Sequence, residues 1–212
     1  MHRLAALLLL VPTMLSAQQA KRAEFWRWFA AHSPALQRAE GDSDPMLDSL
    51  GAALARVHED LTFELGPRDA RRDLVLSADG IREVFPEVEA LYAAAPPMPQ
   101  WHVIKFRPRR ATLNTLEISG HEFDPAHTRF LLVKDDPGKV GILLFLENYT
   151  SAQRNLFGQA GFLILDEALG EYDMETRVGT IDFLGRESKY YAQSRPLTEL
   201  PAAFDKLFAM TG

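Results

Sequence analysis

The chain has 212 residues, no cysteine and a net charge of −6, with 23 basic residues against 29 acidic ones. This acidic balance excludes a general nucleic-acid-binding protein, because such a protein needs a positive field to contact phosphates. The missing cysteines exclude disulfides, a thiolate nucleophile and a zinc site with cysteine ligands. The fold must therefore be held by its hydrophobic core, which a chain of this length can bury.

The N-terminal segment is typical of a secretory signal peptide. A short basic start precedes an apolar run from Leu4 to Leu15, which is followed by the small residues Ser16 and Ala17. The run is shorter than the about 20 residues that a membrane span needs. We predict that residues 1–17 are removed and that the mature chain is exported to the periplasm, without a membrane span. An uncleaved amphipathic anchor is the alternative, although the run lacks a charged face.

The first half of the mature chain alternates helical and extended patterns. Two segments have apolar residues at helical spacing, and two segments after them alternate with a period of two. In the first helical segment, Ser33-Pro34 is a break signal, and the stripe at helical spacing consists of Phe25, Trp28, Phe29, His32 and Leu36. Asp79 and Ser77 are both candidates to cap the next helix. In order, we predict helices over 21–38 and 46–58, a hairpin of strands over 61–65 and 74–76, one turn over 80–85, a helix from Pro86, and a strand over 101–107. In this last strand, alternation places His102, Ile104 and Phe106 on one side, opposite Trp101, Val103, Lys105 and Arg107.

The second half is richer in strands. The segment VGILLFL at 140–146 is almost entirely apolar, as expected for a central strand that is buried on both faces. Gly170 suits the C-terminal cap of a preceding helix, and Thr198 suits the N-terminal cap of the last one. In order, we predict strands over 116–118, 130–133 and 140–146, a helix over 152–169, a strand over 177–184 and a final helix. The turn DDPGK at 135–139 and the spacing of the strands on either side of it predict a hairpin.

Sequential strands joined by short turns predict an α+β fold rather than a doubly wound sheet. We expect a mainly antiparallel sheet with helices packed on one face. Because neither internal repeats nor a linker composition occurs in the sequence, we predict one domain over residues 18–212.

The segment VLSADGI at 75–81, a helix, the tripeptide AAP and the pattern W-x-x-x-x-F-R-P-R follow one another in this order. Together with the FWRWF segment at 25–29 and LGEYD at 169–173, they resemble a group of uncharacterised bacterial proteins. The resemblance covers most of the mature chain and implies a single domain. It implies no activity, cofactor or site residue.

The usual catalytic signatures do not occur in the sequence, among them G-x-S-x-G, the phosphate-binding loop, G-x-G-x-x-G and H-E-x-x-H. We therefore predict no cofactor. The sequence leaves open whether the protein is an enzyme.

Candidate metal ligands lie in the segment HEFDPAH, where His121, Glu122, Asp124 and His127 supply residue types that bind zinc and similar ions. Their spacing matches no closed metal site, and Pro125 restricts the loop. A solvated polar loop is the simpler interpretation, so we predict no resident metal, and the four residues stay as candidate ligands.

Candidate catalytic residues lie in an acidic group between residues 166 and 175. Two carboxylates can act as acid and base when the fold sets them about 5–10 Å apart, and Glu171 and Asp173 are the pair to consider. A calcium site is a poorer match, because the regular oxygen spacing is missing. The alternative is a solvated helix end, where charged residues usually lie.

A basic segment stands out in this acidic chain and contains Lys105, Arg107 and Arg109, with Trp101 just before it. Guanidinium and ammonium groups at one place favour a surface that binds an anion or carboxylate. Two alternatives stay open: the arginines can pair with the acidic group of the same chain, and the tryptophan can belong to the core.

These observations favour a non-catalytic binding or interaction protein of the bacterial cell envelope, with a small anionic ligand or a protein as its partner. The alternative is a carboxylate-dependent hydrolase of the periplasm.

Overall fold

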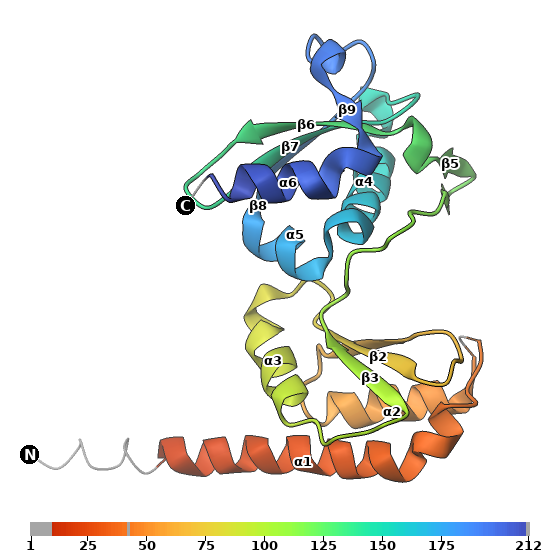
Figure 1. Ribbon diagram of the computed structural model, residues 1–212, viewed down its shortest axis with the longest axis vertical. Coiled ribbons are helices and arrows are strands. Elements are labelled where there is room, and N and C mark those ends of the chain that lie inside the picture. Colours follow the sequence, from red (N-terminus) through yellow and green to blue (C-terminus); the bar gives the residue numbers. More distant parts are fainter. Residues whose placement is uncertain (1–9, 42, 211–212) are drawn as a thin grey trace, which may run out of the picture. The chain divides into compact units, whose positions relative to one another are not determined.

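The computed structural model describes residues 10–41 and 43–210, and its contacts divide the chain into two compact units, residues 1–106 and 107–212 (Figure 1). Each unit has its own cluster of buried apolar side chains. Residues 1–9 of the predicted signal peptide lie outside the described residues. The rest of that segment is part of helix α1 (Leu10–Leu36), which continues through the predicted cleavage site. Across the described residues, every helix is too short or too polar to cross a membrane.

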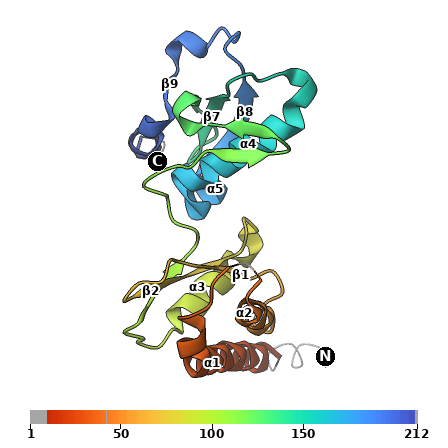
Figure 2. The same ribbon diagram turned by 90° about the vertical axis from the view of Figure 1, so that its right-hand side faces the viewer.

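Unit 1 is a three-stranded sheet with helices on one face (Figures 1 and 2). Strand β2 lies in the middle, antiparallel to β1 and parallel to β3. The parallel pair requires a crossover, which α3 provides after a short 3-10 turn at Arg82–Val84. The elements after α1 are α2 (Pro45–Ala55), β1 (Thr62–Leu65), β2 (Arg72–Ser77), α3 (Phe85–Ala93) and β3 (Trp101–Lys105).

The core of unit 1 lies between this sheet and α1, α2 and α3. Strand alternation puts Leu74 and Leu76 on the helical face, where they join the aromatic stripe of α1. Phe25 and Phe29 are almost fully buried there. The stripe that the sequence predicts for this helix is therefore core. The helix itself runs through Pro34, at which the sequence indicated a break.

Phe106 departs from the predicted alternation of the last strand in unit 1. Its φ of 64° is in the left-handed region, which turns the ring into the core although the two-residue period assigned it to the opposite face. The amide of Phe106 donates to the Leu76 carbonyl at 2.7 Å, and its ring packs on Phe85 at 4.5 Å between centroids. These contacts compensate for a backbone conformation that bulky residues rarely adopt.

Unit 2 contains a four-stranded sheet in the order β8-β7-β6-β9 and a separate small hairpin, β4–β5. As predicted, β6 and β7 form an antiparallel pair and β7 is an interior strand. The strands are β4 (Leu116–Ile118), β5 (His121–Phe123), β6 (Arg129–Lys134), β7 (Val140–Phe145), β8 (Val178–Leu184) and β9 (Arg195–Pro196). The helices are α4 (Arg154–Leu169), α5 (Glu171–Arg177) and α6 (Leu200–Phe208).

Helices α4 and α6 pack on the face of this sheet that carries Phe130, Ile142 and Leu144. Gly170, with a φ of 77°, ends α4 as predicted, and α5 starts directly after it. The sequence did not predict α5. The capping role that it assigned to Thr198 is wrong, because α6 begins at Leu200 after a 3-10 turn and has no side-chain cap.

The α+β class is confirmed. The sheet prediction is correct only in part, since the described strands form three sheets and the pairs β2–β3 and β7–β8 are parallel. The sequence missed the parallel pairs because a crossover and a hairpin leave the same two-residue period in each strand. One domain over residues 18–212 stays a prediction, because two cores occur both in bipartite domains and in domain pairs.

Candidate functional site

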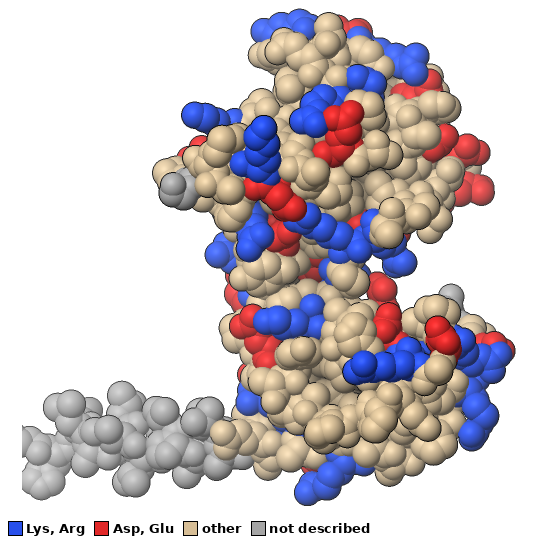
Figure 3. All heavy atoms as spheres, in the orientation of Figure 1, with Lys and Arg blue, Asp and Glu red and all other residues tan. Residues whose placement is uncertain are grey.

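The arginines of the basic segment pair with the acidic group of the same unit. The Arg107 guanidinium donates from Nε to Asp166 at 2.9 Å, and Arg110 lies 3.2 Å from Glu167. On the face of the molecule shown in Figure 3, basic and acidic side chains lie next to one another. The alternative of internal pairing therefore describes this segment, and these arginines do not form an isolated positive surface.

Arg109 is at the centre of a network of hydrogen bonds in unit 2. It donates to both carboxylate oxygens of Asp205 at 2.9 and 2.7 Å, to Asp173 at 2.5 Å and to the Leu169 carbonyl at 3.0 Å. The hydrogen bonds to Asp205 raise the pKa of the guanidinium, and the same contact lowers the pKa of Asp205. Both groups stay charged at neutral pH, so this ion pair stabilises the unit.

The two candidate catalytic carboxylates are also held by this segment. Glu171 is 0 % exposed, and its carboxylate accepts the backbone N–H of Arg107 at 3.0 Å. Asp173 accepts from Arg109 and from Arg177, the latter at 2.9 Å. Both carboxylates therefore have partners within the protein: Glu171 accepts a backbone N–H, and Asp173 is ion-paired with two arginines. Neither contact is the arrangement of an acid and base pair that faces a cleft.

The other two candidates for ligand binding belong to unit 1. Trp101 is 2 % exposed; its Nε1 donates to Ser33 Oγ at 2.7 Å and its ring contacts Phe29 edge-on. Lys105 pairs with Glu89 at 3.1 Å. The structure therefore places the tryptophan in the core, which was the second alternative, and leaves it no face for a ligand.

The HEFDPAH segment does not gather its four candidate ligands. His121 lies against Ser119 O and Gln153 Nε2, at 3.2 and 3.1 Å. His127 lies 3.0 Å from Glu147 and 3.6 Å from Asp124, which caps the 3-10 turn Pro125–His127. Glu122, Asp124 and His127 line one pocket with Glu147, whereas His121 is not part of its lining. Within the described part of the chain, no group of three or more His, Asp or Glu residues is arranged to hold a metal ion.

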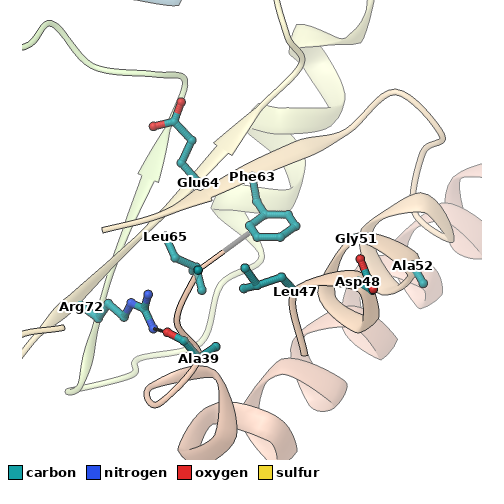
Figure 4. Close-up of a pocket in the computed structure, with 10 residues that line it drawn as sticks. Ala39, Leu47, Asp48, Gly51, Ala52, Phe63, Glu64, Leu65 and Arg72 are labelled. Carbon is teal, nitrogen blue, oxygen red and sulfur yellow. Dashed lines mark hydrogen bonds between the residues drawn. The ribbon is translucent and has the colours of Figure 1, made fainter. Parts of the chain in front are cut away.

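A groove of about 730 Å³ in unit 1 was not predicted from the sequence. It lies between α2 and the edge strand β1, and Arg72 of β2 is part of its lining (Figure 4). Its apolar side chains include Leu47 from α2 and Phe63 and Leu65 from β1. A concave surface of this size is the usual form of a ligand site in proteins, and here the apolar side chains share the lining with Asp48 and Arg72.

Among the described residues that line this groove, Arg72 is the one basic residue, and its side chain is held by several hydrogen bonds. The side chain is 6 % exposed and donates to the carbonyls of Gly66, Leu36 and Ala39 at 2.7, 2.6 and 3.1 Å. Burial, together with the nearby charge of Arg68, lowers the pKa of this guanidinium. Because its hydrogen bonds go to neutral carbonyls, its positive charge has no carboxylate partner among these contacts.

Acidic residues line the groove in two ways. Asp48 stands on the exposed side of α2, whereas the Glu64 side chain points away from the groove in Figure 4. Glu64 therefore lines the groove through its backbone. The sequence predicted the two elements that form the groove, the helix over 46–58 and the strand over 61–65. It does not indicate which edge of a strand remains without a neighbouring strand.

Comparison of the chain with protein-family models, with curated proteins and with solved structures finds no match. The resemblance to a group of bacterial proteins therefore stays a prediction. The function has to be argued from the geometry of the groove and of the charged network.

Proposed function

We propose that this protein is a non-catalytic binding protein of the bacterial cell envelope, and that its ligand occupies the groove between α2 and β1. The groove itself is the observation that carries the proposal. Its volume of about 730 Å³ is within the range of about 300–1,000 Å³ that small-molecule and cofactor sites have.

The composition of the groove favours binding over catalysis. Its acidic side chains do not converge, because Asp48 is on α2 and Glu64 points away from the cavity (Figure 4). No histidine is among the residues that line it, and Arg72 already donates to three backbone carbonyls. A general acid and base need to meet at one point in a cleft, and these residues do not.

The hydrolase alternative receives less support. It relies on Glu171 and Asp173, and both carboxylates are engaged by arginine groups of the segment 107–110 or by Arg177. A catalytic carboxylate can be paired in the resting state, but it needs access to a substrate, and Glu171 is fully buried.

Export is the second part of the proposal and is supported by the sequence of residues 1–17. Cleavage after Ala17 leaves a chain that begins at Gln18, whose side-chain amide donates to the Val57 carbonyl at 3.1 Å and to Glu87 at 3.3 Å. The contacts of unit 1 are therefore kept in the mature chain. N-terminal sequencing of the periplasmic fraction should give Gln18 as the first residue; full-length chain in the cytosol would contradict export.

The binding function is tested with a variant that fills the groove. A Cβ on Gly51 would lie 3.8 Å from the Phe63 ring, which is ordinary contact, so Gly51→Gln places a longer side chain across the cavity without a clash at its base. Ala55→Gln is the matched control, since Ala55 is exposed on the same helix and does not line the groove.

Purified residues 18–212 and both variants are screened by NMR against a fragment library. We expect fragments whose affinity Gly51→Gln lowers by about tenfold or more, a loss of about 1.4 kcal/mol, with Ala55→Gln unchanged. Turnover of an ester, amide or glycoside substrate that disappears in Glu171→Gln would instead support the hydrolase.

A further inference from the structure

We infer that the groove receives an extended polypeptide segment, which pairs with the edge of β1 as a fourth strand of the unit 1 sheet. The inference rests on the proposed binding function and names the class of ligand. Three features of unit 1 carry it: the direction of the backbone groups of β1, the width left by α2, and the charge on the α2 wall.

Two residues of β1 direct their backbone polar groups away from the sheet. The Gly66 amide donates to the Asp73 carbonyl at 3.0 Å, which identifies these opposite residues as a hydrogen-bonded pair. In an antiparallel ladder, hydrogen-bonded pairs alternate with pairs that do not bond. The backbone N–H and C=O groups of Glu64 are therefore bonded to β2, and those of its neighbours Phe63 and Leu65 point away from β2.

The hydrogen bonds on the other side of β2 are consistent with this assignment of the backbone groups. The Leu76 carbonyl, opposite Phe63 in the register, accepts from Phe106 rather than from β1. The N–H and C=O groups of Phe63 and Leu65 thus lie two residues apart on the outer edge of the sheet, because β1 is its first strand. An added strand uses this spacing to form main-chain hydrogen bonds.

Helix α2 leaves room beside that edge. Two of its residues that line the groove, Gly51 and Ala52, have the smallest side chains available. A neighbouring strand lies about 4.8 Å from its partner, so small residues on the facing helix allow a backbone to enter. Leu47, Phe63 and Leu65 then receive every second side chain of the added strand, which favours apolar residues at those positions (Figure 4).

The carboxylate on the α2 wall favours a basic residue at one position of the bound segment, although Arg72 also lines the groove. Asp48 is exposed on the α2 wall, and the guanidinium of Arg72 is directed to the carbonyls of Leu36, Ala39 and Gly66. A lysine or arginine of the bound segment would find a carboxylate at this wall. An acidic segment would meet Asp48 with like charge, which costs affinity.

The probes for the test are peptides of about eight residues, selected from a random displayed library on residues 18–212 and then synthesised, since a strand of this length covers β1. We expect selected sequences that alternate apolar residues with other residues and that carry lysine or arginine. On binding, hydrogen exchange at the Phe63 and Leu65 amides should slow by about tenfold or more, while the Glu64 amide, already bonded to β2, changes little.

Two sets of variants sharpen the test. Gly51→Gln should weaken the peptides by about tenfold, and Ala55→Gln should leave their affinity within about twofold. Alternate residues of a bound strand direct their backbone N–H groups to opposite sides, so only every second residue of the peptide faces β1. N-methylation of the residues that face β1 should abolish binding, and N-methylation of the residues between them should not.

Several results would overturn strand addition. They are a selection without enriched peptides, enriched peptides that leave the Phe63 and Leu65 amides unprotected, or protection of these amides that rises with protein concentration alone. The last result would make a second copy of this chain the occupant. If fragments bind in a manner sensitive to Gly51→Gln while peptides do not, the proposed binding function stands and only the peptide inference fails.

Discussion

Asp205 accepts two hydrogen bonds from the guanidinium of Arg109, at 2.9 and 2.7 Å, although 96 positions separate the two residues in the sequence. The contact joins α6 to the segment that leads out of Phe106, and Asp173 of α5 binds the same guanidinium. Three parts of unit 2 are therefore tied together by one side chain, which gives the basic segment a structural role.

The two carboxylates around Arg109 should differ in their contribution to stability. Asp173 is 13 % exposed and binds both Arg109 and Arg177, whereas Asp205 is 55 % exposed. We expect Asp173→Asn to lower the free energy of unfolding by about 2–3 kcal/mol, as for a charged hydrogen bond that is largely shielded from water. Asp205→Asn should cost about 1 kcal/mol or less, because solvent screens it.

Urea unfolding followed by hydrogen exchange of unit 2 measures both effects. Intrinsic fluorescence is the internal control, since all three tryptophans of the chain lie in unit 1. An equal cost for the two substitutions would contradict this interpretation of the network.

The same network predicts an acid-dependent loss of stability. The hydrogen bond from Arg109 lowers the pKa of Asp205 in the folded state below the value of about 3.9 in an unfolded chain. A lowered pKa stabilises the fold above the unfolded value, and this stabilisation disappears as the pH falls through the folded value. The contribution of this contact to the stability of unit 2 should therefore be constant between about pH 5 and 7 and decrease below about pH 4. The Asp205→Asn variant should show a smaller loss in an acid titration followed by circular dichroism.

Helix α4 approaches β8 through two glycines that differ in their freedom. A Cβ at Gly161 would overlap the ring of Phe183, whereas a Cβ at Gly158 would lie 3.6 Å from that ring. We expect Gly161→Ala to destabilise unit 2 by about 1–2 kcal/mol through overpacking. The matched variant Gly158→Ala should stabilise it by about 0.5–1 kcal/mol, because alanine favours the helix. Thermal unfolding of the two variants gives the sign, and stabilisation by Gly161→Ala would contradict the contact.

Substitution of Trp101 tests whether this residue belongs to the core or to a ligand-binding surface. It is 2 % exposed and hydrogen-bonded to Ser33, so Trp101→Ala should cost about 3–5 kcal/mol and Trp101→Phe about 1–2 kcal/mol. Urea titration followed by the fluorescence of Trp26 and Trp28 measures both. If Trp101→Ala leaves the midpoint unchanged, the residue cannot be part of the packed core.

Arg72 should contribute strongly to the free energy of unfolding of unit 1, in which it lines the groove. Arg72→Met leaves the carbonyls of Leu36, Ala39 and Gly66 without this donor, and we expect a loss of about 3 kcal/mol. Arg68→Met is the control, because Arg68 is about half exposed and pairs with Glu40 at the surface; it should cost less than about 0.5 kcal/mol. Tryptophan fluorescence again monitors unit 1. Equal midpoints for the two variants would show that the carbonyls are satisfied in another way.

The sequence by itself determined most elements and their faces. The aromatic spacing of the first helix, the restart at Pro86, the β6–β7 hairpin and the cap at Gly170 all depend on residues within a few positions of one another. Local propensity and hydrophobic period govern such features, so the α+β class followed from them. The sequence allowed the burial of Trp101 and the internal pairing of the arginines as alternatives. It could not decide between the alternatives, because the contacts that do so come from distant segments.

Only the tertiary structure decided which edge of the first sheet stays open and which charges meet. The outward backbone groups of Phe63 and Leu65 follow from the register with β2, and the partners of Arg109 come from α5 and α6. Contacts across many residues depend on how the apolar faces pack, and a single sequence does not record that packing. The basic segment with Arg107 and Arg109 thus supplies internal ion pairs, while the groove beside β1 carries the functional proposal.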